Sequence, residues 1–130
     1  MKEGGESAMW VEIEGVDVRK GVDMSGGLLD LYIETLAVFH GDGVMKIDEI
    51  NTCLETNNLS LYAIYVHALK SAAASIGAEK LSETAKTLEI AGDQEDLNFI
   101  QKHNEQFLSD LTRLLNNIED ALSAYGDHKS

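Results

Sequence analysis

Apolar residues recur at helical spacing along most of the chain, beginning clearly at Leu28. The first run predicts a helix over residues 28–40, because Gly41-Asp42-Gly43 follows and two glycines so close together favour a break. A second helix is predicted over 44–55. The side chains expected to face the core from these two segments are Leu28, Leu31, Tyr32, Thr35, Leu36, Phe39, Ile47, Ile50 and Leu54.

Three further helices are predicted, over residues 59–76, 79–91 and 94–124. The pair Asn57-Asn58 is suited to end one helix and cap the next, and Gly77 is suited to a left-handed stop. Gly92 is expected to close the fourth helix, and Asp93 with Asp96 resembles a capping box. The apolar stripe of the last helix comprises Ile100, Phe107, Leu111, Leu114, Ile118 and Leu122, while Leu81, Ala85 and Leu88 are expected to be buried in the fourth.

These segments predict an all-α fold. It is an antiparallel four-helix bundle with a short N-terminal helix or arm and a long C-terminal helix. Residues 1–15 are expected to form a flexible arm or the remnant of a linker, part of which packs down through Met9, Trp10, Val11 and Ile13. A short helical turn is possible near 16–21. The bundle itself is assigned to residues 16–125 and a tail to residues 126–130.

The composition of the chain disfavours several classes of function. Ten basic against 23 acidic residues give a net charge of -13, which disfavours binding to nucleic acid or to anionic membrane surfaces. Apolar runs are too short to span a bilayer, so we expect a cytoplasmic protein. Cys53 is the only cysteine, and its apolar-periodic surroundings indicate a small buried hydrophobe rather than a reactive thiol.

The most informative residue is His67, in the middle of the helix predicted over 59–76. At about 100° per residue, Tyr62, Leu69 and Ile76 lie opposite it on a face suited to burial. An imidazole turned outward in the middle of a helix and surrounded by small residues is typical of a nucleophile open to a macromolecular partner. A plain surface histidine is the alternative.

The neighbours of His67 strengthen the functional interpretation. Lys70 lies one turn away and can neutralise charge added to the imidazole. Ser71 is too short to obstruct an approaching surface, and Ile64 leaves an apolar side chain that a partner could cover. The surface expected to receive the partner comprises Ser60, Ala63, Ile64, Ala74 and Ala78.

Other sites have little support in the sequence. No histidine follows a glutamate by three residues, and there is no Cys/His cluster, so no metal site is expected. No phosphate-binding glycine motif is present, so the chain is not expected to use ATP itself. His40 is expected to cap a helix C-terminus, His103 to lie at the core boundary and His128 to be solvated in the tail.

The segment from His67 to Ala78 resembles the phosphoacceptor motif of histidine-containing phosphotransfer (HPt) domains, approximately H-x-L-K-G-[SA]-[SA]-x-x-[LIV]-G-A. The resemblance continues upstream through 29–39 and downstream through Leu81, Ala85, Leu88, Glu89, Gly92 and Asp93, and covers roughly residues 15–122. Where the motif has glycine this chain has Ser71. Serine is also small, so we expect activity to survive. Its hydroxyl can bond to a phosphoryl group or the imidazole, or back to the carbonyl of Ala68 or His67.

The resemblance implies a phosphorelay intermediate. His67, through Nε2, would accept a phosphoryl group from a receiver-domain aspartyl-phosphate and pass it to another receiver's aspartate. Lys70 would supply part of the charge neutralisation, and the receiver would supply Mg²⁺, so no cofactor of its own is expected. Receiver domains of response regulators or hybrid sensor kinases are the implied partners, and a monomer is the default for the family.

Three other functions compete with this interpretation. The phosphoacceptor domain of a histidine kinase is disfavoured because Ala68 and Ala72 stand where that motif has an acidic residue and a proline. A non-catalytic helical adaptor stays open, and acid-labile, base-stable phosphate on the protein would exclude it. A helical-bundle enzyme would need a ligand cavity that the small set of apolar residues does not suggest.

Overall fold

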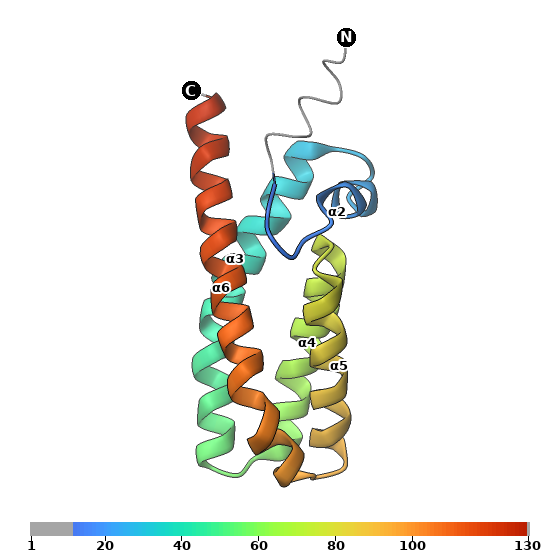
Figure 1. Ribbon diagram of the computed structural model, residues 1–130, viewed down its shortest axis with the longest axis vertical. Coiled ribbons are helices and arrows are strands. Elements are labelled where there is room, and N and C mark those ends of the chain that lie inside the picture. Colours follow the sequence, from blue (N-terminus) through green and yellow to red (C-terminus); the bar gives the residue numbers. More distant parts are fainter. Residues whose placement is uncertain (1–11, 130) are drawn as a thin grey trace.

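The computed structural model describes residues 12–129, with side chains up to residue 126, and every regular element in that range is a helix. Four long helices form the bundle, and a short one, α2 (Val18–Met24), lies across one end (Figure 1). The long helices are α3 (Leu29–Glu55), α4 (Leu59–Ile76), α5 (Glu79–Asp93) and α6 (Leu97–Lys129). The predicted all-α four-helix bundle is therefore confirmed.

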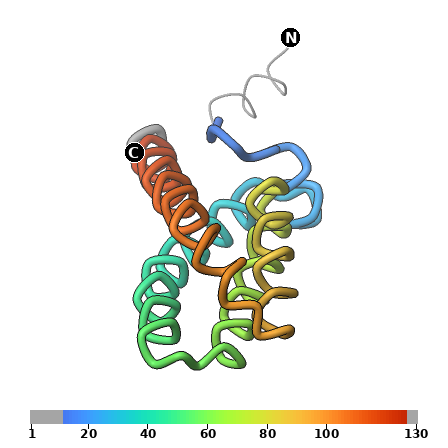
Figure 2. The backbone as a smooth tube through the Cα atoms, turned by 60° about the horizontal axis from the view of Figure 1, so that its bottom comes forward, coloured from blue at the N-terminus to red at the C-terminus, as the bar shows by residue number. Residues whose placement is uncertain are grey.

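Consecutive helices pack as neighbours, and α6 returns to pack against α3 (Figures 1 and 2). Connections of two or three residues make this antiparallel order necessary, because so short a loop cannot carry the chain across the bundle. The core between the helices is formed by large side chains that are fully buried, among them Tyr32, Tyr62, Phe107, Leu36, Leu69, Ile76, Leu88 and Leu111.

The ends of α4 were predicted correctly. Asn57 adopts a positive φ of 57°, and the side chain of Asn58 accepts a hydrogen bond from the Leu61 amide at 3.2 Å. At the other end Gly77 has a φ of 92°, and the Ala78 amide donates to the Ala73 carbonyl at 2.9 Å. These two stops fix the helix that carries His67.

The predicted break at Gly41-Asp42-Gly43 is wrong, because α3 runs through it without interruption. Neither glycine has a positive φ, and each costs the helix only about 1 kcal/mol relative to alanine. Packing against α4 and α6 outweighs that cost. Gly43 also has a positive use, since a Cβ there would lie 2.8 Å from Leu115 Cδ2. The glycine lets α3 and α6 approach closely.

Several smaller expectations change as well. Leu28 and Leu31 are exposed, whereas Tyr32, Leu36 and Phe39 of the same segment are buried. Gly92 lies inside α5, where it contacts Ala63. The last helix begins at Leu97 rather than residue 94, because the Asp96 side chain accepts from the Phe99 amide and caps it there. It ends at Lys129 and so includes residues expected to form a tail.

The start of the described chain is held against the bundle. Ile13 is buried, as the sequence predicts, while Met9, Trp10 and Val11 lie outside the described residues. The Asp17 amide donates to the Gly77 carbonyl at 2.8 Å, and the Asp17 side chain caps α2 by accepting from the Lys20 amide. The expected turn near 16–21 is thus the helix Val18–Met24, which begins and ends two to three residues further along the chain.

Candidate functional site

His67 lies in the middle of α4, and its side chain is 56% exposed. Val66 and Leu69 beside it in sequence are buried, as are Tyr62 and Ile76 on the opposite face. The amphipathic pattern therefore turns the imidazole outward, as the sequence predicts. Because the backbone amides around it are already bonded within the helix, they are not free to donate a hydrogen bond to the ring.

The principal contact of His67 comes from the neighbouring helix. Glu89 of α5 places its Oε2 atom 2.7 Å from His67 Nδ1. A carboxylate only accepts hydrogen bonds, so this contact assigns the ring proton to Nδ1 as donor. In the neutral imidazole Nε2 is then the nitrogen with the lone pair, and it has no hydrogen-bond partner among the described side chains.

Lys70 binds the other oxygen of the same carboxylate. Its Nζ atom lies 2.8 Å from Glu89 Oε1, one turn along α4 from His67. The Lys70 side chain is 27% exposed, and an ammonium has three donors, so it can hold Glu89 and still reach a second anion. The three side chains form a His67–Glu89–Lys70 cluster across the α4–α5 interface.

Glu89 is ionised at neutral pH. Its partial burial opposes ionisation, but the hydrogen bonds and charges of Lys70 and His67 outweigh it and lower the pKa of the carboxyl below its usual value. The cluster is thus built on a fixed negative charge between an imidazole and an ammonium.

The predicted partner surface is only partly accessible. Ser60, Ile64 and Ser71 are exposed, Ile64 to 61%, and Ala74 is half-buried. Ala63 and Ala78 are buried and cannot contact a partner, so their assignment to this surface is wrong. Both residues are buried because of α5. This helix packs against the Ala63 side of α4, and Ala78 lies in the tight turn that leads into α5. The Ser71 hydroxyl makes no hydrogen bond within the described residues.

Sequence reasoning gave Glu89 no role, although a signal was present. Ala85 and Leu88 mark the buried face of α5, and Glu89 follows directly, at the edge of that face. The exposed apolar side chains of α3 were not predicted either: Leu31 was expected to face the core, and Val38 and Met45 were given no role. They recur every seven residues and so lie on one side of the helix.

The other histidines lack such an arrangement. His40 lies inside α3 rather than at a helix end, so it caps nothing; its Nε2 atom is 4.0 Å from Glu119 Oε1. His103 is exposed rather than at the core boundary, and its ring contacts Phe99. The side chain of His128 lies outside the described part of the chain. Cys53 is buried as predicted, and burial raises the pKa of its thiol.

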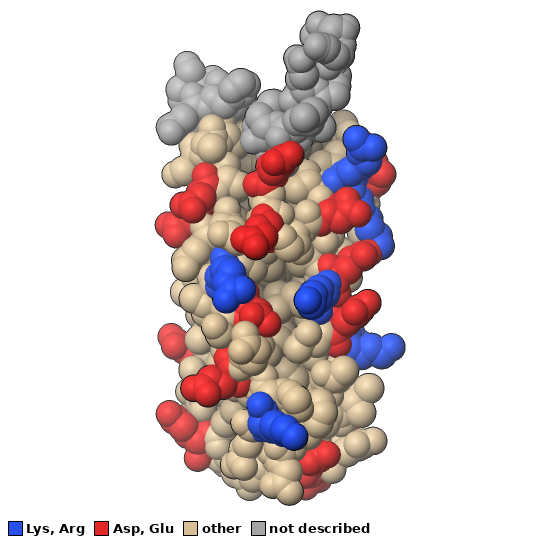
Figure 3. Space-filling view, in the orientation of Figure 1, with Lys and Arg blue, Asp and Glu red and all other residues tan. Residues whose placement is uncertain are grey.

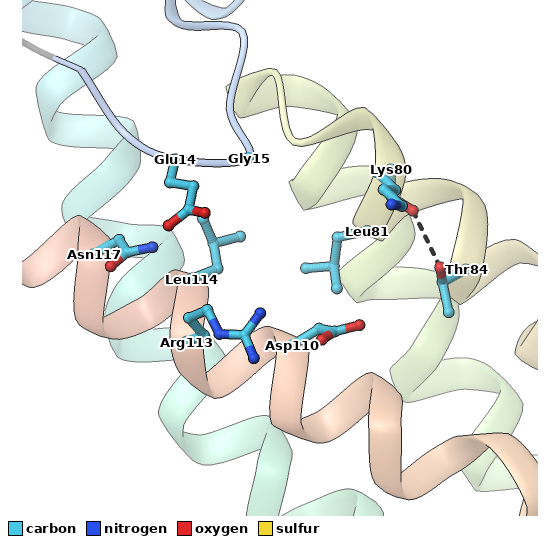
Figure 4. Close-up of a pocket in the computed structure, with 9 residues that line it drawn as sticks. All are labelled: Glu14, Gly15, Lys80, Leu81, Thr84, Asp110, Arg113, Leu114 and Asn117. Atoms are coloured by element: carbon cyan, nitrogen blue, oxygen red, sulfur yellow. Dashed lines mark hydrogen bonds between the residues drawn. The ribbon is translucent and has the colours of Figure 1, made fainter.

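Other possible sites are distinct from the cluster. Among the described residues no group of three or more His, Cys, Asp or Glu could hold a metal ion, and no helix could span a membrane. A hollow of about 270 Å³ lies between residues 14–15, α5 and α6, with Arg113, Lys80 and Asp110 around it (Figure 4). None of its lining residues belongs to the cluster. On the face shown in Figure 3, acidic and basic side chains are interspersed and form no basic patch.

A comparison with known families gives a match. A family model described as Hpt domain matches residues 34–106, which is more than half of the chain and includes His67, Lys70 and Glu89. No curated protein and no solved structure shows a significant match.

Proposed function

Because the chain belongs to the Hpt domain family, whose members are phosphocarriers in two-component signalling, we propose that His67 is its phosphoacceptor. The observation that carries this proposal is the orientation of the ring. Glu89 holds Nδ1 at 2.7 Å, while the imidazole is 56% exposed and Nε2 has no partner among the described side chains.

The proposed donor is a receiver-domain aspartyl-phosphate. The Nε2 lone pair attacks phosphorus, the N–P bond forms, and the P–O bond to the aspartyl carbonyl breaks and leaves the receiver's carboxylate. The reverse step on a second receiver returns the imidazole. No acid or base is consumed, so the site needs in-line access and charge compensation above all.

Glu89 and Lys70 compensate the two charges that develop. Attack by a neutral imidazole leaves positive charge on the ring, and the Glu89 carboxylate at Nδ1 offsets it. The phosphoryl group brings negative charge, which the Lys70 ammonium offsets from one turn away. Glu89 acts as a positioning residue for both, since it contacts the ring and the ammonium together.

The middle of a helix suits a transient carrier. Free amides at a helix N-terminus would hold a phosphate tightly, whereas those around His67 are bonded within α4. The phosphoryl group would therefore stay transferable. Family members have no ATP site of their own, so the phosphoryl group must come from a partner, and Mg²⁺ would come from the receiver.

We propose that the receiver covers the exposed face of α4 together with the apolar side of α3. Ile64 lies one turn from His67 on α4, and Leu31, Val38 and Met45 are 45%, 70% and 59% exposed on α3. Lys46, next to Met45, lies 5.4 Å above the Tyr65 ring of α4, so this part of α3 adjoins α4. A monomer acting in the cytoplasm would leave this surface open to successive receivers.

The test is acceptance of label from a phosphorylated receiver by the intact chain, compared between His67→Gln and His40→Gln. We expect His67→Gln to lose all acid-labile, base-stable phosphate, because among the described side chains no other histidine is held at Nδ1 by a carboxylate that also binds a lysine. His40→Gln should accept label as the unmodified chain does. Label on His67→Gln would overturn the assignment. An unmodified chain that accepts no label from any receiver would instead favour the adaptor.

A further inference from the structure

Ser82 of α5 makes a contact with α4 that lies outside the His67–Glu89–Lys70 cluster. Its side chain is half-buried, and its hydroxyl donates a hydrogen bond to the backbone carbonyl of Lys70 at 2.9 Å. That carbonyl lies inside α4, where it accepts one bond within the helix and has a second lone pair for Ser82. Among the described residues, this is the only hydrogen bond from a side chain of α5 to the backbone of α4.

Lys70 is therefore bound to α5 at both of its ends. Ser82 binds the backbone carbonyl, and Glu89 binds the ammonium group at 2.8 Å. Ser82 and Glu89 are seven positions apart, so they lie on the same face of α5, about 10 Å from each other along the helix axis. Two contacts separated in this way fix the axial position of α5 on α4, which a single contact of one flexible side chain does not.

Gly92 sets the distance between the same two helices. A Cβ atom at this position would lie 3.0 Å from Ala63 Cβ and 3.2 Å from Tyr62 Cδ2. Both distances are shorter than ordinary van der Waals contact between carbon atoms, so the missing side chain lets α5 approach α4 closely. Glu89 lies between Ser82 and Gly92 along α5, in the part of the helix that these two contacts hold.

The position of α5 matters because the contact between Glu89 and His67 is short and directional. Glu89 Oε2 lies 2.7 Å from His67 Nδ1, and a hydrogen bond weakens steeply as it is misaligned. The hydrogen bond at one nitrogen of a neutral imidazole determines which of the two nitrogens carries the proton. A shift of α5 along α4 would therefore loosen Glu89 from Nδ1 and move the proton to Nε2 for part of the time.

We propose that Ser82 is a positioning residue for His67. By binding the Lys70 carbonyl, Ser82 fixes the register of α5 on α4, and this register keeps Glu89 on Nδ1 and the lone pair on Nε2. The inference rests on the proposed role of His67 as the phosphoacceptor, because a lone pair on Nε2 is what the attack on phosphorus requires.

The test measures the tautomers of His67 in the full chain, labelled with ¹⁵N in its histidines and free of phosphate, at about pH 9, where histidine is neutral. The ¹⁵N shifts of the two ring nitrogens give the ratio of the Nδ1–H form to the Nε2–H form. We expect the Nδ1–H form to dominate in the unmodified chain. The ratio should fall about threefold in Ser82→Ala, which loses one hydrogen bond, and further in Glu89→Ala, which loses the acceptor itself.

Ser75→Ala is the matched control. Ser75 is also half-buried, and its hydroxyl also donates to a backbone carbonyl, but this carbonyl belongs to Ala72 of the same helix, at 2.7 Å. Removal of the Ser75 hydroxyl should leave the tautomer ratio of His67 unchanged. Transfer from a phosphorylated receiver should slow in Ser82→Ala, by no more than the factor by which the tautomer ratio falls, and should be unchanged in Ser75→Ala.

Two results would overturn the positioning role of Ser82. The first is an unchanged tautomer ratio in Ser82→Ala, whatever happens to the free energy of unfolding, because Ser82 would then have a purely structural role. The second is an equal fall of the ratio in Ser75→Ala. Label on His67→Gln would instead overturn the proposed phosphoacceptor, and the tautomer ratios, which are measured without phosphate, would still stand. The two failures are therefore distinguishable.

Discussion

The α4–α5 pair and the α3–α6 pair each bring a histidine toward a glutamate of the neighbouring helix. In the first, Glu89 approaches Nδ1 of His67 to 2.7 Å and Lys70 binds the same carboxylate. In the second, Glu119 lies 4.0 Å from Nε2 of His40, a ring only 27% exposed. A histidine in the middle of a helix and near a carboxylate is therefore not sufficient for the phosphoacceptor that we propose. Three features decide whether the ring is suited to be a nucleophile. They are the nitrogen that the carboxylate binds, the exposure of the other nitrogen and the presence of a nearby cation.

The largest effect expected from the surroundings of either ring is that of Glu89→Ala. A hydrogen bond to a charged group contributes about 1.5–3 kcal/mol, so transfer to His67 should slow about 10- to 100-fold. Glu119→Ala, the matched change in the other pair, should leave the rate unchanged. Rapid-quench measurement of transfer from a phosphorylated receiver checks both. Equal transfer rates in the two variants would show that Glu89 takes no part in the transfer and that the two histidine–glutamate contacts do not differ in function.

Lys70→Ala should have a smaller effect. A partly exposed ion pair contributes about 1 kcal/mol, which corresponds to transfer slower, or a phosphohistidine lifetime shorter, by about fivefold. The bundle should stay folded, because the Lys70 side chain is partly exposed and outside the core. Lys80→Ala removes the same charge from an exposed position in the first turn of α5, outside the His67–Glu89–Lys70 cluster, and serves as control. Kinetics that match this control would show that Lys70 does not compensate the phosphoryl charge.

Substitution of the two glycines in α3 tests how closely α3 packs against α6. Gly41→Ala meets nothing within 4 Å and should stabilise the helix by about 1 kcal/mol. Gly43→Ala gains the same propensity but places its Cβ 2.8 Å from Leu115 Cδ2, and such overpacking costs about 1–3 kcal/mol. Urea unfolding should therefore rank Gly41→Ala as the more stable by that margin. The reverse order would show that α3 and α6 do not need the close approach.

Ser71→Gly should have the smallest effect. Glycine in place of serine lowers helix propensity by about 0.5 kcal/mol, so the free energy of unfolding should fall by that amount. Ser71 is exposed and makes no hydrogen bond in the described chain, so the transfer rate should change by no more than about twofold. Thermal unfolding and transfer kinetics of this variant check the two values. A larger loss of rate would give the hydroxyl a part in binding the phosphoryl group.

The sequence was sufficient where a local rule decides the structure. Asn58 and Gly77 specify the ends of α4 through their own side chain and backbone, and the apolar stripe of α4 determines that His67 faces outward. The sequence misled where tertiary packing opposes a local rule. Gly43 reads as a helix breaker, but its place against Leu115 can be known only once α6 is in position.

For the site, the sequence likewise predicts what lies on one helix but not what a second helix contributes. His67 and Lys70 lie on one helix, so their spacing places them together. Glu89 comes from another helix, and only the packing of α4 on α5 shows that its carboxylate reaches both. The same packing buries Ala63, which the isolated α4 helix would leave exposed.

In the phosphorylated state that we propose, Nε2 of His67 carries the phosphoryl group while Glu89 holds Nδ1. Nuclear magnetic resonance of the phosphorylated chain, labelled with ¹⁵N in its histidines, shows which nitrogen is modified. We expect a ³¹P–¹⁵N coupling to Nε2 of His67, with Nδ1 still protonated. A phosphoryl group on Nδ1 of His67, or on any other residue, would contradict it.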